Sequence, residues 1–188
     1  MARLAHGLIR GAAASLLLAG AAAAADPDGA RATVVVDKPP APLAHIHKVA
    51  AQNTPSGFTV PRFVSLKFGK VNARSGPSRD HAIRYQYRRR GLPLVVVAET
   101  EMWRKVRDIH GDEAWVRKPA LSGERRAITL SDVPLSAKAR ADARVLARVQ
   151  RGALVSLGEC RDGFCRVETS AGLKGWIRRH ELWGAQSL

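Results

Sequence analysis

Short apolar runs separated by turn residues fill the chain from Phe58 onward. Segments 62–69, 92–99, 103–108 and 114–117 alternate or cluster their apolar residues as strands do, and segments 153–160, 164–168 and 175–179 have the same character. Stretches such as "RSGPSRD", "DIHGDE" and "LSG" separate the runs. Strands this short, at spacings of about ten residues, predict a small all-β sandwich or barrel.

The second half of this region repeats the first half in register. Each of six positions is matched by a similar residue 61 positions later: Gly91 by Gly152, Trp103 by Phe164, Val106 by Val167, Gly111 by Gly172, Trp115 by Trp176 and Leu121 by Leu182. Basic residues keep the same register. Chance does not produce so long an ungapped series, so the sequence predicts two copies of one all-β unit, at residues 58–124 and 125–188.

The repeat decides between helix and strand for one segment. The stretch "SAKARADARVLARVQRG" (136–152) has high helix propensity. Its counterpart, "SRDHAIRYQYRRRG" (78–91), alternates Ile83, Tyr85 and Tyr87 as a strand does. Because homologous positions share a backbone conformation, we expect residues 144–149 to be extended.

The chain before Phe58 has a different composition and a different pattern of apolar residues. Residues 1–25 combine a basic start, an apolar run and small residues ending at Ala25, which are features of a cleaved export signal. The apolar run is shorter than the roughly 20 residues of a membrane span. Residues 26–57 contain "DKPPAPLAHIHK" and show no sustained period, so we expect a Pro-rich flexible tether. The expected location is periplasmic or secreted, with cleavage near Ala25 and no transmembrane span in the mature chain.

Both cysteines of the chain lie in "CRDGFC", at Cys160 and Cys165. Export would place them in a compartment where disulfides persist. Two strands joined through "RDG" would bring the two positions opposite each other. We therefore expect a Cys160–Cys165 disulfide, and a pair of unbridged, partly buried thiols is the alternative.

The charge of the chain is strongly positive. Thirty-one Lys and Arg residues face 16 Asp and Glu residues, which gives a formal net charge of +15. Such a protein attracts anionic partners at long range, more strongly at low salt. An exported protein rarely meets nucleic acid, so we do not expect nucleic acid as a partner. The remaining readings are an anionic surface of the cell envelope or a solvated basic surface with no specific anion.

No set of residues in the sequence predicts catalysis. A nucleophile needs a neighbouring base and a third group that orients the base. Cys165 is the obvious thiol, but His180, the one histidine that follows it, falls in a predicted strand and turn. Two small β units also leave no length for a separate catalytic domain. We therefore expect no enzyme activity and no cofactor.

Metal binding is not expected either. His45 and His47 fall well short of the four ligands of a structural zinc site. The other residues that could hold a cation are Asp108, His110, Asp112 and Glu113, which are more simply explained as the polar tip of a hairpin.

Four segments of the first copy together resemble bacterial SH3-like domains: "VNARSGPS" (71–78), "GLPLVVVAE" (91–99), "WRKVRD" (103–108) and "AWV" (114–116). The resemblance covers about residues 55–185 and implies two small SH3-like barrels in tandem. Trp115 and Trp176 each follow a small residue, which lets a bulky ring lie against a neighbouring strand, so we expect both in the core, with ligand contact as the alternative. Two departures stand out. The glycine that usually precedes the tryptophan is Ala114 in the first copy, although Gly175 keeps it in the second. The second copy also has "VPLSAKA" (133–139) in place of "NARSGP".

The resemblance implies an exported, non-catalytic binding protein that recognises a peptidoglycan peptide or another envelope protein. Aromatic-lined grooves between SH3 loops hold extended peptides. The candidate ligand-binding residues are the turn and the aromatics of the first copy: Asn72, Arg74, Ser75, Tyr85, Tyr87 and Trp103.

Two further hypotheses remain open. The alternative function is electrostatic association with phospholipid or lipopolysaccharide, which is suggested by the basic clusters 88–90, 125–126 and 178–179. In addition, "KPPAPL" (38–43) is a polyproline-type segment. Tethered to the SH3-like units, it would be able to occupy a ligand groove of its own chain.

Overall fold

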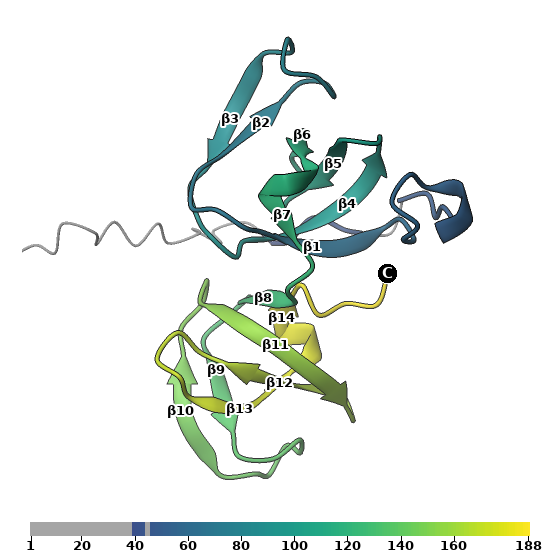
Figure 1. Ribbon diagram of the computed structural model, residues 1–188. Helices are drawn as coiled ribbons and strands as arrows, with labels where there is room; N and C mark the ends of the chain where they lie inside the picture. Colours follow the sequence, from purple (N-terminus) through teal and green to yellow (C-terminus); the bar gives the residue numbers. More distant parts are fainter. Residues whose placement is uncertain (1–38, 44–45) are drawn as a thin grey trace, which may run out of the picture. The chain divides into compact units, whose positions relative to one another are not determined.

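The computed structural model describes residues 39–43 and 46–188 (Figure 1). Besides strands, this part contains three single-turn 3-10 helices: η1 (Ala51–Asn53), η2 (Lys118–Ala120) and η3 (Arg179–Glu181). None of the helices in the described residues is long and apolar enough to cross a membrane. The predicted export signal, residues 1–25, and His45 lie outside the described residues.

Seven antiparallel strands form the sheet of the first barrel. They are β1 (Arg62–Leu66), β2 (Val71–Arg74), β3 (Ile83–Tyr87), β4 (Pro93–Glu99), β5 (Trp103–Arg107), β6 (Glu113–Arg117) and β7 (Leu121–Ser122). Their order in the sheet is β3-β2-β6-β5-β4-β1-β7. Alternate residues of these strands point inward, and Leu94, Val96, Val106 and Val116 are completely buried.

The second barrel repeats this sheet strand for strand. Its strands are β8 (Arg126–Thr129), β9 (Val133–Ser136), β10 (Val145–Val149), β11 (Leu154–Arg161), β12 (Phe164–Glu168), β13 (Lys174–Arg178) and β14 (Leu182–Trp183). The order β10-β9-β13-β12-β11-β8-β14 matches that of the first sheet position by position. The prediction of an all-β chain with two barrels in tandem is confirmed.

Loop lengths explain where the two copies keep register and where they shift. From β4 and β11 onward, equivalent residues are 61 positions apart. In the preceding hairpins they are 62 apart, because the connection 150–153 is one residue shorter than 88–92. Gly91 and Gly152 occupy equivalent places in these connections, both with φ of 76°, a conformation that favours glycine. The expectation that residues 144–149 are extended is confirmed by β10, so cross-strand pairing overrides the local helix propensity.

The two copies fill one core position with different side chains. Three equivalent pairs differ there. Ala73 on β2 corresponds to Leu135 on β9, Tyr85 on β3 corresponds to Ala147 on β10, and Ala114 on β6 corresponds to Gly175 on β13. A Cβ atom on Gly175 would lie 2.6 Å from Leu135 Cγ and 2.9 Å from the Ser136 carbonyl oxygen. Gly175 is therefore the residue that makes room for Leu135, and Ala114 is tolerated in the first copy because Ala73 faces it.

One hairpin position is closed by an ion pair in the first barrel and by a disulfide in the second. Glu99 and Arg104 are directly paired across β4 and β5, with Arg104 Nε 3.0 Å from Glu99 Oε2 and both side chains buried. Cys160 and Cys165 are paired across β11 and β12 and form the expected disulfide. The turn between them has positive φ at Asp162 and at Gly163, as two-residue hairpin turns with an Asp-Gly sequence do.

The described part of the segment 26–57, which we expected to be a flexible tether, is attached to the first barrel. Val49 and Val60 exchange two backbone hydrogen bonds of 2.8 and 3.0 Å. The backbone N–H and the hydroxyl of Ser56 both donate to Glu99 Oε1. Leu43 and Ile46 pack against the core of the barrel. Aliphatic residues placed between the prolines supply contacts that the composition of the segment did not suggest.

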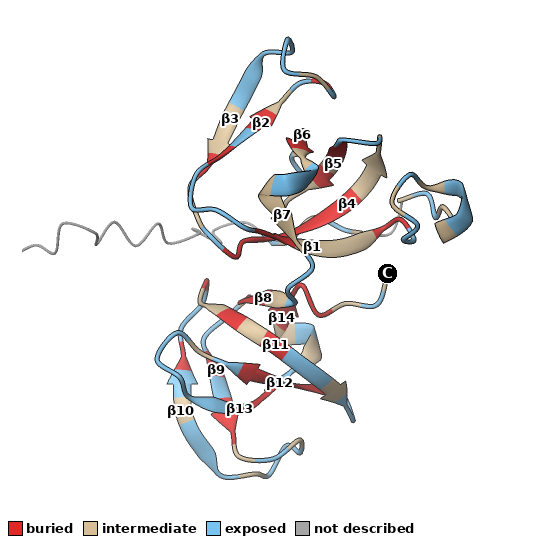
Figure 2. Cartoon of the chain, viewed as in Figure 1, coloured by how far each residue is buried: buried red, intermediate tan, exposed pale blue. Residues whose placement is uncertain are grey.

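Figure 2 shows where the barrels present exposed surface. The first residues of β3 and most residues of β10, the strands at one edge of each sheet, are exposed, whereas β4 and β5 are buried or half-buried throughout. The β2–β3 and β9–β10 hairpins are therefore among the surfaces available to a ligand.

Candidate functional site

Two tyrosines on β3 point into the first barrel and form a hydroxyl pair. Tyr85 is opposite Ala73 and Tyr87 is opposite Val71 on β2. The two hydroxyl oxygens are 3.2 Å apart, and the rings meet edge to face at 5.2 Å between centroids. Tyr87 is buried, whereas Tyr85 is half-buried. The side chain of Tyr85 therefore connects the core of the barrel to solvent.

The turn between β5 and β6 carries two carboxylates, Asp108 and Asp112, whose negative charges raise the pKa of both tyrosines. Asp108 Oδ1 accepts hydrogen bonds from the backbone N–H of His110, at 2.9 Å, and of Asp112, at 3.1 Å. Burial raises the pKa of Asp108 above its ordinary value, although these two hydrogen bonds oppose the change. Its charge is therefore poorly solvated, and a cation brought next to it would be held more strongly than at an open surface.

The tyrosine hydroxyls remain protonated at any physiological pH. Burial raises the pKa of Tyr87 far above its ordinary value, and the neighbouring Tyr85, Asp108 and Asp112 raise it further. Burial also raises the pKa of Tyr85. Both hydroxyls therefore act as neutral hydrogen-bonding groups beside negative charge.

Asp108 differs from most carboxylates of the described residues because burial raises its pKa and no ion pair offsets that burial. Glu113, at the start of β6, forms ion pairs with Lys105 and Arg107, each at 2.6 Å. Within residues 39–43 and 46–188, no basic side chain forms an ion pair with Asp108 or Asp112. The turn therefore offers a poorly solvated negative charge to a ligand.

The Pro-rich segment docks on the same turn. The backbone N–H of Ala41 donates to the carbonyl oxygen of Ile109 at 2.9 Å, and proline residues flank Ala41 on both sides. A Cβ atom on Gly111 would lie 2.9 Å from the Ala41 side chain, so the two backbones approach closely here. An extended peptide strand is therefore already bound at the edge of the tyrosine and aspartate cluster.

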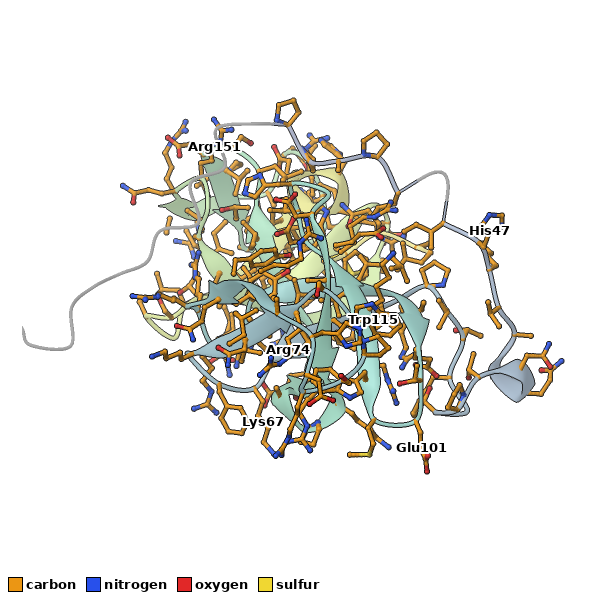
Figure 3. The ribbon with its side chains drawn as sticks, turned by 90° about the horizontal axis from the view of Figure 1, so that it is seen from above. His47, Lys67, Arg74, Glu101, Trp115 and Arg151 are labelled. Atoms are coloured by element: carbon orange, nitrogen blue, oxygen red, sulfur yellow. A yellow bond between two sulfur atoms is a disulfide. The ribbon has the colours of Figure 1, made fainter. Side chains whose placement is uncertain are left out.

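The residues predicted for the ligand site lie on two different faces. Asn72 and Arg74 alternate with the inward-facing residues of β2 and point away from the tyrosines. Asn72 accepts a hydrogen bond from Gln86, and Arg74 donates to the His81 carbonyl oxygen at 2.7 Å. Arg74 is also paired across the strands with Trp115, a half-buried residue (Figure 3).

The other two predicted residues, Ser75 and Trp103, do not join the tyrosines. Ser75 is exposed in the turn after β2, and its backbone N–H donates to the Ala82 carbonyl oxygen. Trp103 is only 7% exposed and belongs to the interior, so it offers a ligand little more than an edge. Of the predicted set, only Tyr85 and Tyr87 are brought together with ionisable side chains.

The residues that the sequence prediction did not include are Asp108, Ile109 and Asp112. The string "DIHGD" was recognised as a polar hairpin tip, and nothing in it indicates that the tip faces Tyr85. Its proximity to β3 arises only when the sheet closes.

The second copy has none of these groups. The positions equivalent to the two tyrosines are Ala147 and Val149 on β10. Thr169 takes the place of Asp108 and keeps only its structural role, because Thr169 Oγ1 accepts a hydrogen bond from the Leu173 backbone N–H. The tyrosine and aspartate groups therefore belong to the first copy alone.

A pocket of about 350 Å³ lies elsewhere, on the second barrel, beside the bulge of β11. Its lining includes Arg166, Glu168 and Lys174. Lys174 and Glu168 pair with each other at 3.4 Å, so they largely satisfy each other's charge. The tyrosine and aspartate cluster is the stronger candidate because Asp108 is poorly solvated and a segment of the chain already binds at the same turn. No group of three His, Cys, Asp or Glu residues in the described part of the chain is placed to hold a metal ion.

The chain was compared with known proteins. No curated protein matches the sequence. Two solved structures are similar to part of the chain. NlpC2 from Trichomonas vaginalis is 17% identical, and the match covers 66% of this chain and 48% of that one with a TM-score of 0.31. NlpC1 from the same organism is 16% identical, and the match covers 65% of this chain and 45% of that one with a TM-score of 0.30. The chain thus matches less than half the length of either structure. A family model described as a bacterial SH3 domain matches residues 67–123 and again residues 131–184, together more than half of the chain. The chain belongs to the bacterial SH3 domain family and carries two copies of the domain.

Proposed function

We propose that the protein is an exported, non-catalytic binding protein whose first barrel recognises a peptide that bears a cationic group, such as a peptide stem of the cell wall. The observation that carries the proposal is the turn 108–112, where the Ile109 carbonyl oxygen accepts a hydrogen bond from Ala41 and where the charges of Asp108 and Asp112 raise the pKa of Tyr85 and Tyr87. An ammonium group is the chemical complement of these carboxylates. The peptide stems of the cell wall contain a diamino acid and therefore supply one.

The docked amino-terminal segment supports the same surface as a peptide site. Ala41 shows that the carbonyl oxygen of Ile109 accepts a hydrogen bond from an extended strand. Main-chain hydrogen bonds of this kind give affinity, and nearby side chains give preference for particular ligands. A ligand strand would use the Ile109 carbonyl oxygen and place its ammonium group toward Asp108.

The test is retention on purified cell-wall sacculi. The variant Asp108→Asn/Asp112→Asn removes both charges, while the amide oxygen introduced at position 108 keeps the ability to accept the turn hydrogen bonds. Since a hydrogen bond to a charged group contributes about 1.5–3 kcal/mol, we expect a loss of affinity of roughly tenfold or more. The control is Asp142→Asn, which removes one exposed carboxylate from the second barrel.

The two possible failures of this test are distinguishable. If the unmutated protein is not retained on sacculi, the cell-wall ligand is wrong. If it is retained and the double variant binds equally well, the ligand exists but the site is misplaced. A Trp103→Ala variant is unsuitable for this purpose because Trp103 is buried, so its loss would destabilise the barrel instead of testing binding.

A further inference from the structure

The β9–β10 hairpin of the second barrel has an unusual combination of side chains. From residue 137 to 148 it contains only alanines, Val145, Leu146, one acidic residue and four basic residues: Lys138, Arg140, Arg144 and Arg148. All four basic side chains are exposed. The one acidic residue, Asp142, pairs with Arg140 at 2.8 Å. Residues 137–148 therefore combine positive charge with apolar surface and contain no neutral polar side chain.

A β-bulge presents two neighbouring aliphatic residues on this hairpin to solvent. The pairing of β10 with β9 shifts between Val145 and Ala147, so Leu146 is the extra residue. A bulge re-aims side chains that strict alternation would turn inward. Val145 is 52% exposed and Leu146 is 42% exposed. Two adjacent exposed aliphatic side chains on an outermost strand are a liability unless something covers them.

The first barrel has the same bulge but different chemistry. There the pairing shifts around Arg84, which occupies the position of Leu146 and donates to the Glu113 carbonyl oxygen. The loop that precedes it is closed by its own polar contacts, including Ser78 with His81 at 2.8 Å. If a charged side chain were needed only to protect the outermost strand from pairing with another chain, we would expect Arg at both bulges. The aliphatic residue in the second copy therefore calls for a different explanation.

We propose that the β9–β10 hairpin is a contact site for anionic phospholipid membranes. Lys138, Arg144 and Arg148 bind the phosphate groups of the lipids, and Val145 and Leu146 enter the boundary between headgroups and acyl chains. Segments with Lys and Arg beside exposed aliphatic residues bind membrane surfaces in this way. The site is on the second barrel and is independent of the peptide site proposed for the first.

The test is cosedimentation of the full chain with phosphatidylcholine vesicles prepared with and without phosphatidylglycerol. Neutralising Arg144 and Arg148 to Gln should weaken binding to the anionic vesicles about twentyfold, since one basic residue at an anionic surface contributes a factor of about five. The matched control is Arg79→Gln/Arg88→Gln, which removes the same charge from exposed positions of the first barrel. An equal loss in both variants would mean that the net charge alone drives binding, and would overturn the proposal.

A second pair of variants tests the apolar part. Val145→Ser/Leu146→Ser should lose about tenfold in binding to the anionic vesicles, because two partly exposed aliphatic side chains no longer leave water. The control Ile83→Ser removes an aliphatic residue that is 50% exposed from the first barrel and should have little effect. Circular dichroism confirms that each variant is folded. Absence of binding by the unmutated protein, or unchanged binding by the serine variant, would refute the proposed contact.

Discussion

Replacement of Gly175 by Ala tests the packing argument for the second barrel. No positive φ is required at Gly175, so the cost of the substitution is steric. The added Cβ would lie 2.6 Å from Leu135 Cγ and 2.9 Å from the Ser136 carbonyl oxygen, neither of which is the free end of a flexible group. Overpacking of this kind costs about 1–3 kcal/mol. Loss of the glycine's backbone freedom returns about 0.5–1 kcal/mol.

We therefore expect Gly175→Ala to lower the free energy of unfolding by about 1–2 kcal/mol, the difference between the steric and the backbone contributions. The assay is urea denaturation of the full chain, followed by circular dichroism. Leu135→Ala alone should cost about 2–5 kcal/mol because it opens a cavity. In the double variant, the methyl group added at position 175 occupies space that Leu135 vacates, as Ala114 does beside Ala73. The double variant should therefore be more stable than the sum of the single effects predicts.

Gly69→Ala is the control, because a Cβ atom on Gly69 meets nothing within 4 Å and no positive φ is needed there. It should be neutral or slightly stabilising. A Gly175→Ala variant as stable as the unmutated protein, or strictly additive effects of Gly175→Ala and Leu135→Ala, would refute the proposed exchange of volume between these positions.

Two further predictions concern the first barrel. Glu99→Cys/Arg104→Cys should form a disulfide, because Glu99 and Arg104 pair across the first hairpin as Cys160 and Cys165 pair across the second. Closing so short a loop should raise the free energy of unfolding by about 2 kcal/mol. Free thiols under oxidising conditions, measured by thiol titration, would contradict the equivalence of the two hairpins. Removal of residues 26–43 should raise the affinity for sacculi, because the Ala41 contact then no longer occupies the peptide site; an unchanged affinity in the pull-down would count against self-masking.

The architecture followed from sequence because its signals are local and occur twice. Turn residues and apolar alternation locate the strands, and the repeat corrected the one segment whose propensity pointed to helix. The outcome at β10 shows why this works. A strand needs partners, and homologous positions in a duplicated domain have equivalent partners even when their own residues favour another conformation.

The candidate site could be predicted from the sequence only in part, because it depends on contacts between segments that are distant along the chain. Tyr85 and Tyr87 were identified from their aromatic character, but Asp108 approaches them only after the sheet closes. Trp103 has the same aromatic character as Tyr85 and is nevertheless buried, since aromatic character alone does not say which side of a strand faces water. The docking of Ala41 on Ile109 was likewise unpredictable, because a single backbone hydrogen bond leaves no trace in the pattern of residues.

The different closures of the two matched hairpins make the barrels sensitive to different conditions. Burial raises the pKa of Glu99, but hydrogen bonds from Ser56 and Arg62 outweigh it and hold the pKa below its ordinary value. The stabilisation from this carboxylate is therefore present at neutral pH and is lost only as the pH falls through that lowered pKa. The Cys160–Cys165 disulfide of the second barrel is insensitive to acid but is reduced by thiols. If the chain is exported as we expect, the disulfide would form only after the chain has left the reducing cytosol, whereas the ion pair needs no oxidising compartment.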